Sequence, residues 1–392
     1  MAALATSETF TRLIDRLGRT GRAGRELAVR LDIVRFTGLP YVWRRQRDEA
    51  SVAALPDPGD VYGTIWRDAA AELGADVVEL GAGFLEIRRD RAWTRVQKGL
   101  TMLDDGATLR LALQKPTVHD LLIKAGLPVP DSLQFEASDL APAVGFLHAG
   151  RVPCVVKPIA GGGGYSVTSG IRTESDLMRA RLRAARVDRR LMIERQALGD
   201  FYRFLFLDGE LLDVIHRRPP RVTGDGQSTL EQLIAAENRR RMDRRHQAVL
   251  WPLRIDLECI LTLQAQGLTL ASVLANGRTI PVKTVISQNT IGDNETVRGG
   301  IAPELIQQAR RAAQVVGLRL AGVDVITADL GRELGAGGGV ILEVNGTPGL
   351  NYHYEVVQPA RATKVAVPIL ETLLANSGPA WVDTESARVS AA

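Results

Sequence analysis

The sequence contains few cysteines, no long apolar run and very few lysines. Only two cysteines, Cys154 and Cys259, occur in 392 residues, and both lie in apolar surroundings. A disulfide-stapled scaffold is therefore excluded, and we expect two buried thiols in a reducing cytoplasm. No apolar run reaches the length of a transmembrane helix, and the N-terminus has no basic-then-apolar signal pattern, so we expect a cytoplasmic protein with no membrane partner.

The cationic residues are almost all arginine. The chain has 49 cationic residues, of which 43 are arginines and 6 are lysines, against 45 acidic residues. Arginine clusters at 179–190 and 239–245 lack the interleaved aromatic residues of a nucleic-acid surface. We interpret them as solvated helix faces and do not expect a nucleic-acid partner. Where such a chain retains a lysine, a compact ammonium group is a candidate functional group.

The most informative stretch is residues 340–349, VILEVNGTPG. Its apolar run predicts a buried strand, yet it carries Glu343 and Asn345, which lie two apart and therefore project from one face. A second apolar run, 321–326, carries Asp324, and a glycine-rich loop joins the runs, so we expect an antiparallel pair. The three side chains would then form a cluster of oxygen ligands suited to Mg²⁺. The alternative is that the two acids are unrelated and lie at strand ends.

Two of the lysines stand where an anion is expected. Lys115 opens a predicted helix with Pro116 in its first turn, and the helix dipole disfavours a lysine there unless an anion also binds. An exposed lysine at a helix start is the alternative. Lys157 lies in a short apolar strand, 153–159, where burial requires a counter-ion such as a nucleotide phosphate. The next residues, 160–166, include four glycines, which suit a phosphate chain but are also typical of a linker.

Taken in this order, the motifs resemble those of the ATP-grasp ligases. Asp324 followed by the segment 343–349, EVNGTPG, is similar to the C-terminal metal motif of that superfamily. The order of strand, lysine and glycine loop is similar to its lid. The nearest resemblance is to the ATP-grasp module of cyanophycin synthetase, and it covers residues 115–374. Glutathione synthetases and the ligases that add glutamate to the tails of ribosomal proteins also resemble the chain, as more distant relatives.

The resemblance implies an α/β (α+β) ATP-grasp fold. Nucleotide would lie between a small lid domain and a C-terminal mixed sheet, preceded by an N-terminal domain. We expect four segments along the chain: an N-terminal domain at 1–113, a lid subdomain at 114–198, a catalytic subdomain at 199–376 and a loose tail at 377–392. Within the N-terminal domain, apolar periodicity predicts helices at 9–34 and 66–73 and strands at 77–80 and 84–87.

The resemblance also implies roles for individual residues. The cofactors would be ATP and Mg²⁺ or Mn²⁺, with the metal on Asp324, Glu343 and Asn345. The residues expected to contact ATP are Lys115, Lys157, Gly162, Gly163, Gly164, Tyr165, Ser166 and Glu194. Arg203 and Arg217 match arginines that face phosphates or a substrate carboxylate and are the expected catalytic residues. The expected substrate-side residues are Arg298, Asn351 and His353. Considered alone, Glu194 could equally be a surface strand end, and His353 an exposed histidine.

The function implied by the resemblance is ATP-dependent carboxylate–amine ligation. A carboxylate would attack the γ-phosphate of ATP, and an amine would displace phosphate from the resulting acyl phosphate. The alternatives are an ATP-grasp kinase and a non-catalytic ATP- or nucleic-acid-binding protein. Cyanophycin synthetase has a second ligase domain with a Walker-type loop, and this sequence contains no such loop. We therefore expect the protein to form one type of amide bond, with amino acids, small peptides or small amines as substrates. Assembly into a homo-oligomer is an open alternative.

Overall fold

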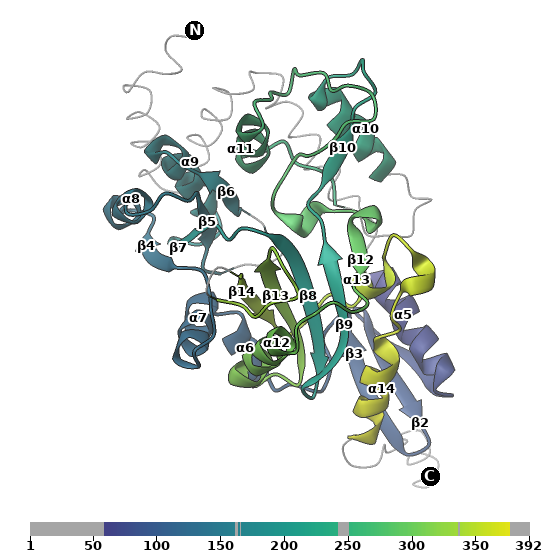
Figure 1. Ribbon diagram of the computed structural model, residues 1–392. Helices are drawn as coiled ribbons and strands as arrows, with labels where there is room; N and C mark the ends of the chain where they lie inside the picture. The colour runs from purple at the N-terminus through teal and green to yellow at the C-terminus, as the bar shows by residue number, and fades with distance from the viewer. Residues whose placement is uncertain (1–58, 161–163, 165, 242–250, 336–337, 377–392) are drawn as a thin grey trace.

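The computed structural model describes residues 59–160, 164, 166–241, 251–335 and 338–376 (Figure 1). The helix predicted at 9–34 and the tail predicted from 377 lie outside these residues, as do Gly162, Gly163 and Tyr165. The described elements form a central sheet, a lid sheet beside it, and an N-terminal layer on one face of the central sheet.

The central sheet has five strands and carries the candidate site. Their order is β12 (Asn294–Thr296), β9 (Glu210–Arg217), β8 (Asp200–Leu207), β13 (Leu320–Thr327) and β14 (Val340–Asn345). We predicted a mixed sheet, but every pairing in it is antiparallel. One reason is the two-residue turn between β8 and β9, where Asp208 and Gly209 have φ of 49° and 81°. Such a turn connects only antiparallel strands.

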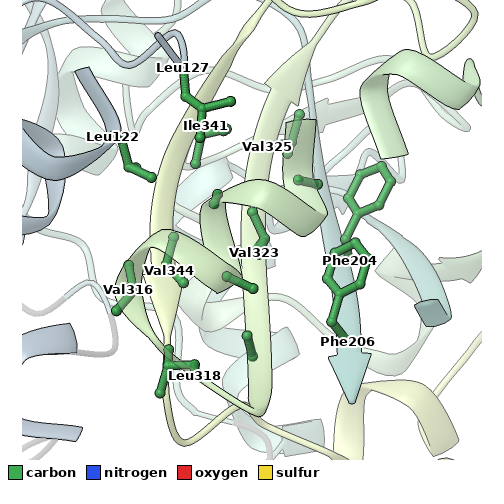
Figure 2. Packing of buried hydrophobic residues seen from close by; sticks show 14 of the residues in the cluster. Leu122, Leu127, Phe204, Phe206, Val316, Leu318, Val323, Val325, Ile341 and Val344 are labelled. Atoms are coloured by element: carbon green, nitrogen blue, oxygen red, sulfur yellow. The ribbon is translucent and has the colours of Figure 1, made fainter. Parts of the chain in front are cut away.

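One face of this sheet carries the largest apolar core (Figure 2). Phe204, Val323 and Val344 point to this face, where α12 (Pro303–Val316), α7 (Lys115–Lys124) and α6 (Gly106–Ala112) cover them. Helix α12 buries residues at three- and four-residue spacings, which makes one apolar stripe. It ends at Gly317, whose φ of 86° is a left-handed conformation that glycine adopts without strain.

The opposite face is covered at one end by an N-terminal layer. This layer contains α5 (Gly59–Glu72) and the antiparallel strands β1 (Asp76–Gly81), β2 (Phe84–Arg89) and β3 (Ala92–Gln97). The helix and two strands predicted here are present, and β3 was not predicted. The C-terminal helix α14 (Ala366–Ala375) packs against α5 and β3, so the last helix shares a core with the first described one.

The lid is a second antiparallel sheet in the order β4 (Ser132–Glu136), β7 (Arg190–Arg195), β5 (Cys154–Pro158) and β6 (Thr168–Ile171). Helices α8 (Ala141–His148) and α9 (Glu174–Ala184) pack on it. Gly199 connects β7 to the central sheet with a φ of 127°. A Cβ atom at Gly199 would stand 2.3 Å from the carbonyl carbon of Thr327, so only glycine fits this connection.

A small module joins the lid to the central sheet. It contains β10 (Arg221–Thr223), β11 (Thr279–Pro281), α10 (Leu230–Arg241) and α11 (Leu257–Ala265). Its completely buried Glu258 accepts hydrogen bonds from the Thr284 backbone at 2.6 Å and from Ser169 of the lid strand β6 at 3.3 Å. Lys283 lies 3.2 Å from the same carboxylate and 2.9 Å from Asp256. This buried ionic cluster ties the module to the lid.

The remaining described helices are short: α13 (Asn351–Tyr354) and three turns of 3₁₀ helix at Ile286–Gln288, Ile291–Asp293 and Pro359–Arg361. No helix in the described part of the chain is long and apolar enough to cross a membrane. Cys154 and Cys259 are both free and buried, which confirms the prediction of buried thiols.

Candidate active site

A row of charged side chains crosses the second face of the central sheet. Strand register places Arg203 of β8 opposite Asp324 of β13, and Asp324 opposite Glu343 of β14. Residues directly opposite in antiparallel strands share a face, so the three side chains line up across the sheet. Asn345 lies opposite Gly322 on the same face. The predicted antiparallel pairing of 321–326 with 340–345 is therefore confirmed.

A β-bulge in β14 places Ile341 and Glu343, which are two residues apart, on opposite faces of the sheet. The register shifts between the pairs Asp324–Glu343 and Val325–Ile341, which leaves Leu342 as the extra residue. Ile341 therefore joins the core, while Glu343 stays in the charged row. The Nε2 atom of His119 lies 3.1 Å from the Leu342 carbonyl oxygen, so α7 holds the bulge. Burial, assisted by Lys157, lowers the pKa of His119, so a neutral ring donates this hydrogen bond.

Arg203 and Asp324 form a buried bidentate ion pair. The Nε and Nη2 atoms of Arg203 each donate to a different carboxylate oxygen of Asp324 at 2.7 Å. Burial alone would lower the pKa of Arg203, but the charge and hydrogen bonds of Asp324 outweigh burial and raise it, so the guanidinium stays charged. Asn345 adds a third hydrogen bond, from its Nδ2 to Asp324 Oδ2 at 3.1 Å.

Lys115 pairs with the other carboxylate of the row. Its Nζ lies 3.4 Å from Glu343 Oε1, and the residue stands at the first position of α7. An anion was expected at this helix start, and in the structure Glu343 is an anion in that position. The pair brings the helix start and β14 together, so Lys115 is not the exposed lysine of the alternative interpretation.

The three predicted metal ligands have the chemistry that Mg²⁺ prefers. Asp324, Glu343 and Asn345 carry oxygen donors on one face. A carboxylate has about four lone-pair positions, so Asp324 can bind Arg203 and still offer a site to a metal. No cluster of three or more His, Cys, Asp or Glu side chains that could hold a metal occurs among the described residues. The donor set therefore reaches three only with the Asn345 amide, which suits a metal that completes its coordination with substrate phosphates.

On the lid, Lys157 and Glu194 form a second buried ion pair. Their Nζ and Oε2 atoms are 2.7 Å apart, and both side chains are more than nine-tenths buried. The counter-ion predicted for Lys157 was a nucleotide phosphate, but the structure supplies Glu194. The reason is the register of β5 and β7, which places Glu194 opposite Val155 and so diagonally beside Lys157. Glu194 is accordingly not a surface strand end.

The described part of the glycine loop approaches the segment after Lys283. Gly164 has a φ of 66°, and a Cβ atom there would stand 2.7 Å from both Val285 and Ser287. Ser166 also has a positive φ, of 59°. These two predicted ATP contacts lie in the loop between β5 and β6, where the Val167 backbone N–H donates to the Gly164 carbonyl oxygen at 3.3 Å.

Arg217 stands at the edge of the row with part of its guanidinium not hydrogen-bonded. Its Cζ lies 3.7 Å from the centre of the Tyr352 ring, and its Nη2 donates to Asn289 Oδ1 at 3.4 Å. Its buried Nε has no hydrogen-bond partner among the described residues. A buried guanidinium with an unused donor favours an anionic ligand. Tyr352 was not predicted, although it lies between two residues that were.

The three substrate-side residues fall in different surroundings. Asn351 accepts a hydrogen bond from Tyr62 and lines a cavity beside Arg217. His353 is completely buried, with Nδ1 2.8 Å from Asp213 Oδ2, and burial lowers its pKa. Its side chain therefore anchors α13 to β9 rather than being an exposed histidine, and it presents no surface to a substrate.

Arg298 contacts the segment before α14 and Asp213 of β9. It donates to the Arg361 carbonyl oxygen at 2.9 Å and to Thr363 Oγ1 at 2.8 Å. These bonds hold the segment before α14. The Arg298 Nη1 atom also lies 3.7 Å from Asp213 Oδ1, a carboxylate that His353 contacts, so the substrate role of Arg298 stays a prediction. Sequence spacing could not reveal these contacts, because they join residues more than 60 positions apart.

Comparison with known proteins places this geometry in a wider family. No family model matches the chain. It is 32% identical over 295 residues to cyanophycin synthetase from Geminocystis herdmanii. This alignment covers 74% of this chain and 33% of that protein. It is 28% identical over 354 residues to a glutathione biosynthesis bifunctional protein from Mannheimia succiniciproducens. This alignment covers 87% of this chain and 45% of that protein. The chain thus spans about a third to a half of the length of the curated relatives it matches.

Among solved structures, the bifunctional glutathione synthetase from Pasteurella multocida superposes with a TM-score of 0.50 at 23% identity, over 78% of this chain and 42% of that chain. This likeness concerns the fold, and it confirms the predicted architecture of a lid sheet and a catalytic sheet. The predicted ATP-grasp fold is therefore confirmed. The sequence is related to that of cyanophycin synthetase, as predicted.

Proposed function

We propose that the chain is an ATP-dependent carboxylate–amine ligase that forms an amide bond through an acyl phosphate. The observation that supports this most is the charged row, in which Arg203, Asp324 and Glu343 stand in register across three strands. A row of paired charges with oxygen donors on one face is suited to phosphoryl transfer, where catalysis consists mainly of positioning and charge stabilisation. The relatives named above are proteins that make amide bonds, which is consistent with this proposal.

The chemistry requires activation of a carboxylate, because a carboxylate does not react with amines. Its oxygen attacks the γ-phosphorus of ATP, the bond to ADP breaks, and an acyl phosphate forms. The nitrogen of an amine then attacks the carbonyl carbon, and the carbon–oxygen bond to phosphate breaks. Overall, carboxylate, ammonium and ATP give amide, ADP, phosphate and one proton.

The residues of this chain have separate tasks in that reaction. Lys115 and Lys157 each sit beside a carboxylate and can turn their remaining N–H donors to phosphate oxygens. Arg217 presents an unused donor and is the candidate contact for the substrate carboxylate or the transferred phosphoryl group. Asp324, Glu343 and Asn345 would hold Mg²⁺, which when bound neutralises charge on the phosphates. Arg203 fixes the orientation of Asp324.

The substrates proposed are an amino acid or small peptide acid and an amino acid or small amine. The test is a screen of acid–amine pairs for ADP release, followed by the mass of the product. We expect ADP and a single amide. AMP as product would refute the acyl-phosphate route, and repeated residue masses would refute a single amide. A stable phosphorylated product without an amine would instead indicate a kinase.

Replacement of Glu343 tests the metal site directly. Glu343→Gln should lower turnover by about two orders of magnitude or more, because the carboxylate that would hold Mg²⁺ beside the transferred phosphoryl group is lost. Glu333→Gln is the matched control, since Glu333 is an exposed carboxylate in the loop of the same hairpin. Near-normal turnover of Glu343→Gln would overturn the proposed metal site.

A further inference from the structure

One extra residue in β14 determines on which face of the sheet Glu343 lies. Ile341 and Val344 both belong to the apolar core, as Figure 2 shows, and Glu343 lies between them in the sequence. In a regular strand, residues two apart share a face, so Glu343 would point into the core with Ile341. The register shift at Leu342 turns Glu343 to the other face, where it lies opposite Asp324. The place of Glu343 in the charged row therefore depends on this bulge.

The bulge lies in an edge strand, and α7 with the segment after it supplies partners for its backbone. β14 is the last strand of the central sheet, so one side of it has no neighbouring strand in that sheet. Two backbone groups at the bulge bond outside the sheet. The Ile341 N–H donates to the Pro128 carbonyl oxygen at 2.8 Å, and the Leu342 carbonyl oxygen lies 3.1 Å from His119 Nε2. The second of these bonds is made to the extra residue itself.

His119 is suited to this contact by its place on α7 and by its burial. It stands four residues after Lys115, so the two side chains project from one face of the helix. They contact consecutive residues of β14, since Lys115 pairs with Glu343 and His119 bonds to Leu342. The ring is 3% exposed, and burial lowers its pKa, so it is neutral. Its buried Nδ1 has no hydrogen-bond partner within the described chain, so the bond to Leu342 is the one that offsets the burial of the ring.

We propose that His119 is a positioning residue for the metal site. Its hydrogen bond to Leu342 fixes the bulge, and the fixed bulge holds the Glu343 carboxylate opposite Asp324 and beside Lys115. His119 acts through the backbone of β14 and does not itself bind the metal. The inference rests on the metal site of the proposed ligase function. It gives α7 a second task, because the helix that carries Lys115 also sets the position of the carboxylate that Lys115 contacts.

The test compares side chains of different reach at position 119. His119→Gln places an amide N–H where the Nε2–H stood, because the same number of bonds leads to that nitrogen in both side chains. His119→Asn carries the same amide on a shorter side chain that does not reach Leu342, and His119→Leu has no donor. His148→Leu is the matched control, since His148 is an exposed histidine on α8 of the lid.

Metal binding is measured without turnover. Mn²⁺ is titrated into the full chain at one fixed ADP concentration, and the rise in Tm gives the half-saturating Mn²⁺ concentration. Binding of ADP in EDTA reports the nucleotide site without metal. We expect His119→Leu and His119→Asn to raise the half-saturating Mn²⁺ concentration about fivefold to tenfold, which is the range that one lost hydrogen bond produces. His119→Gln and His148→Leu should stay within about twofold of wild type, and ADP binding in EDTA should stay within about twofold in every variant.

Different failures have different signatures. If the wild type shows no Mn²⁺-dependent rise in Tm, the metal site is wrong and the inference is overturned with it. If it shows the rise but releases no ADP in the substrate screen, the ligase function is wrong, and the comparison at position 119 still decides the inference. An unchanged half-saturating Mn²⁺ concentration in His119→Leu overturns the inference, as does an equal loss of Mn²⁺ and of ADP binding in EDTA. If His119→Leu does not fold, His119→Asn is compared with His119→Gln, and equal values overturn the inference.

Discussion

Replacing Asp324 by asparagine removes the carboxylate that neutralises Arg203, and the effect on stability can be worked out from the structure. Arg203 is 7% exposed and Asp324 is 3% exposed, and two hydrogen bonds of 2.7 Å join them. The variant leaves the guanidinium buried without its counter-ion. Removing one partner of such a buried pair costs about 3 to 5 kcal/mol in the free energy of unfolding.

The chain contains a matched control with the same geometry at the surface. Arg319 donates to both oxygens of Asp208 at 2.7 and 2.8 Å, but the two side chains are 38% and 43% exposed. Water screens this pair, so Asp208→Asn should cost about 1 kcal/mol or less. Asparagine also tolerates the positive φ of 49° at position 208, so the backbone adds little to the cost.

The assay is urea unfolding followed by circular dichroism, without nucleotide or metal, so that ligand binding does not contribute. The double variant Arg203→Met with Asp324→Asn should lose less than the sum of the two single variants, by about 2 kcal/mol or more, because no buried charge is left unpaired. Equal losses for Asp324→Asn and Asp208→Asn would refute the argument from burial. Additive losses in the double variant would refute the pairing.

Two further predictions concern residues outside the charged row. Lys283→Met should destabilise the folded state by about 3 to 5 kcal/mol at neutral pH, because it leaves the buried Glu258 without its cation and Asp256 with only Arg183. Burial alone would raise the pKa of Asp256, but Lys283, Arg183 and the hydrogen bonds to the carboxylate together outweigh burial and lower it. The wild-type chain therefore keeps this stability above the unfolded pKa of about 4 and loses it as the pH falls further. The variant should lose less stability than the wild type as the pH falls below about 4, because its Asp256 pKa is less depressed, and identical pH profiles in urea titrations would contradict this. Gly199→Ala should cost at least about 2 kcal/mol, because its Cβ meets the backbone of Thr327. Gly209→Ala also has a positive φ, but its Cβ would make only ordinary van der Waals contact, 3.5 Å from the Gln314 side chain. It should therefore cost only about 1 kcal/mol, and equal losses would argue against the clash.

Much of the fold followed from local patterns in the sequence. Two predicted features are present: the start of α7 at Lys115 with a proline in its first turn, and the pairing of the two apolar runs that carry Asp324 and Glu343. These features depend on residues close together or on simple strand alternation. The order of the motifs likewise predicted the lid and the catalytic sheet, since that order is a property of the chain itself.

The partners of the charged groups depended on the tertiary structure. Lys157 pairs with Glu194 because two strands adopt one register, and His353 is buried because β9 brings Asp213 to it. Tyr62 reaches Asn351 across 289 positions of sequence. The residue types and their order determined the fold class and the residues of the charged row. Burial and long-range register decided which charges neutralise one another and which face the cavity, because both are properties of packed elements that no local pattern contains.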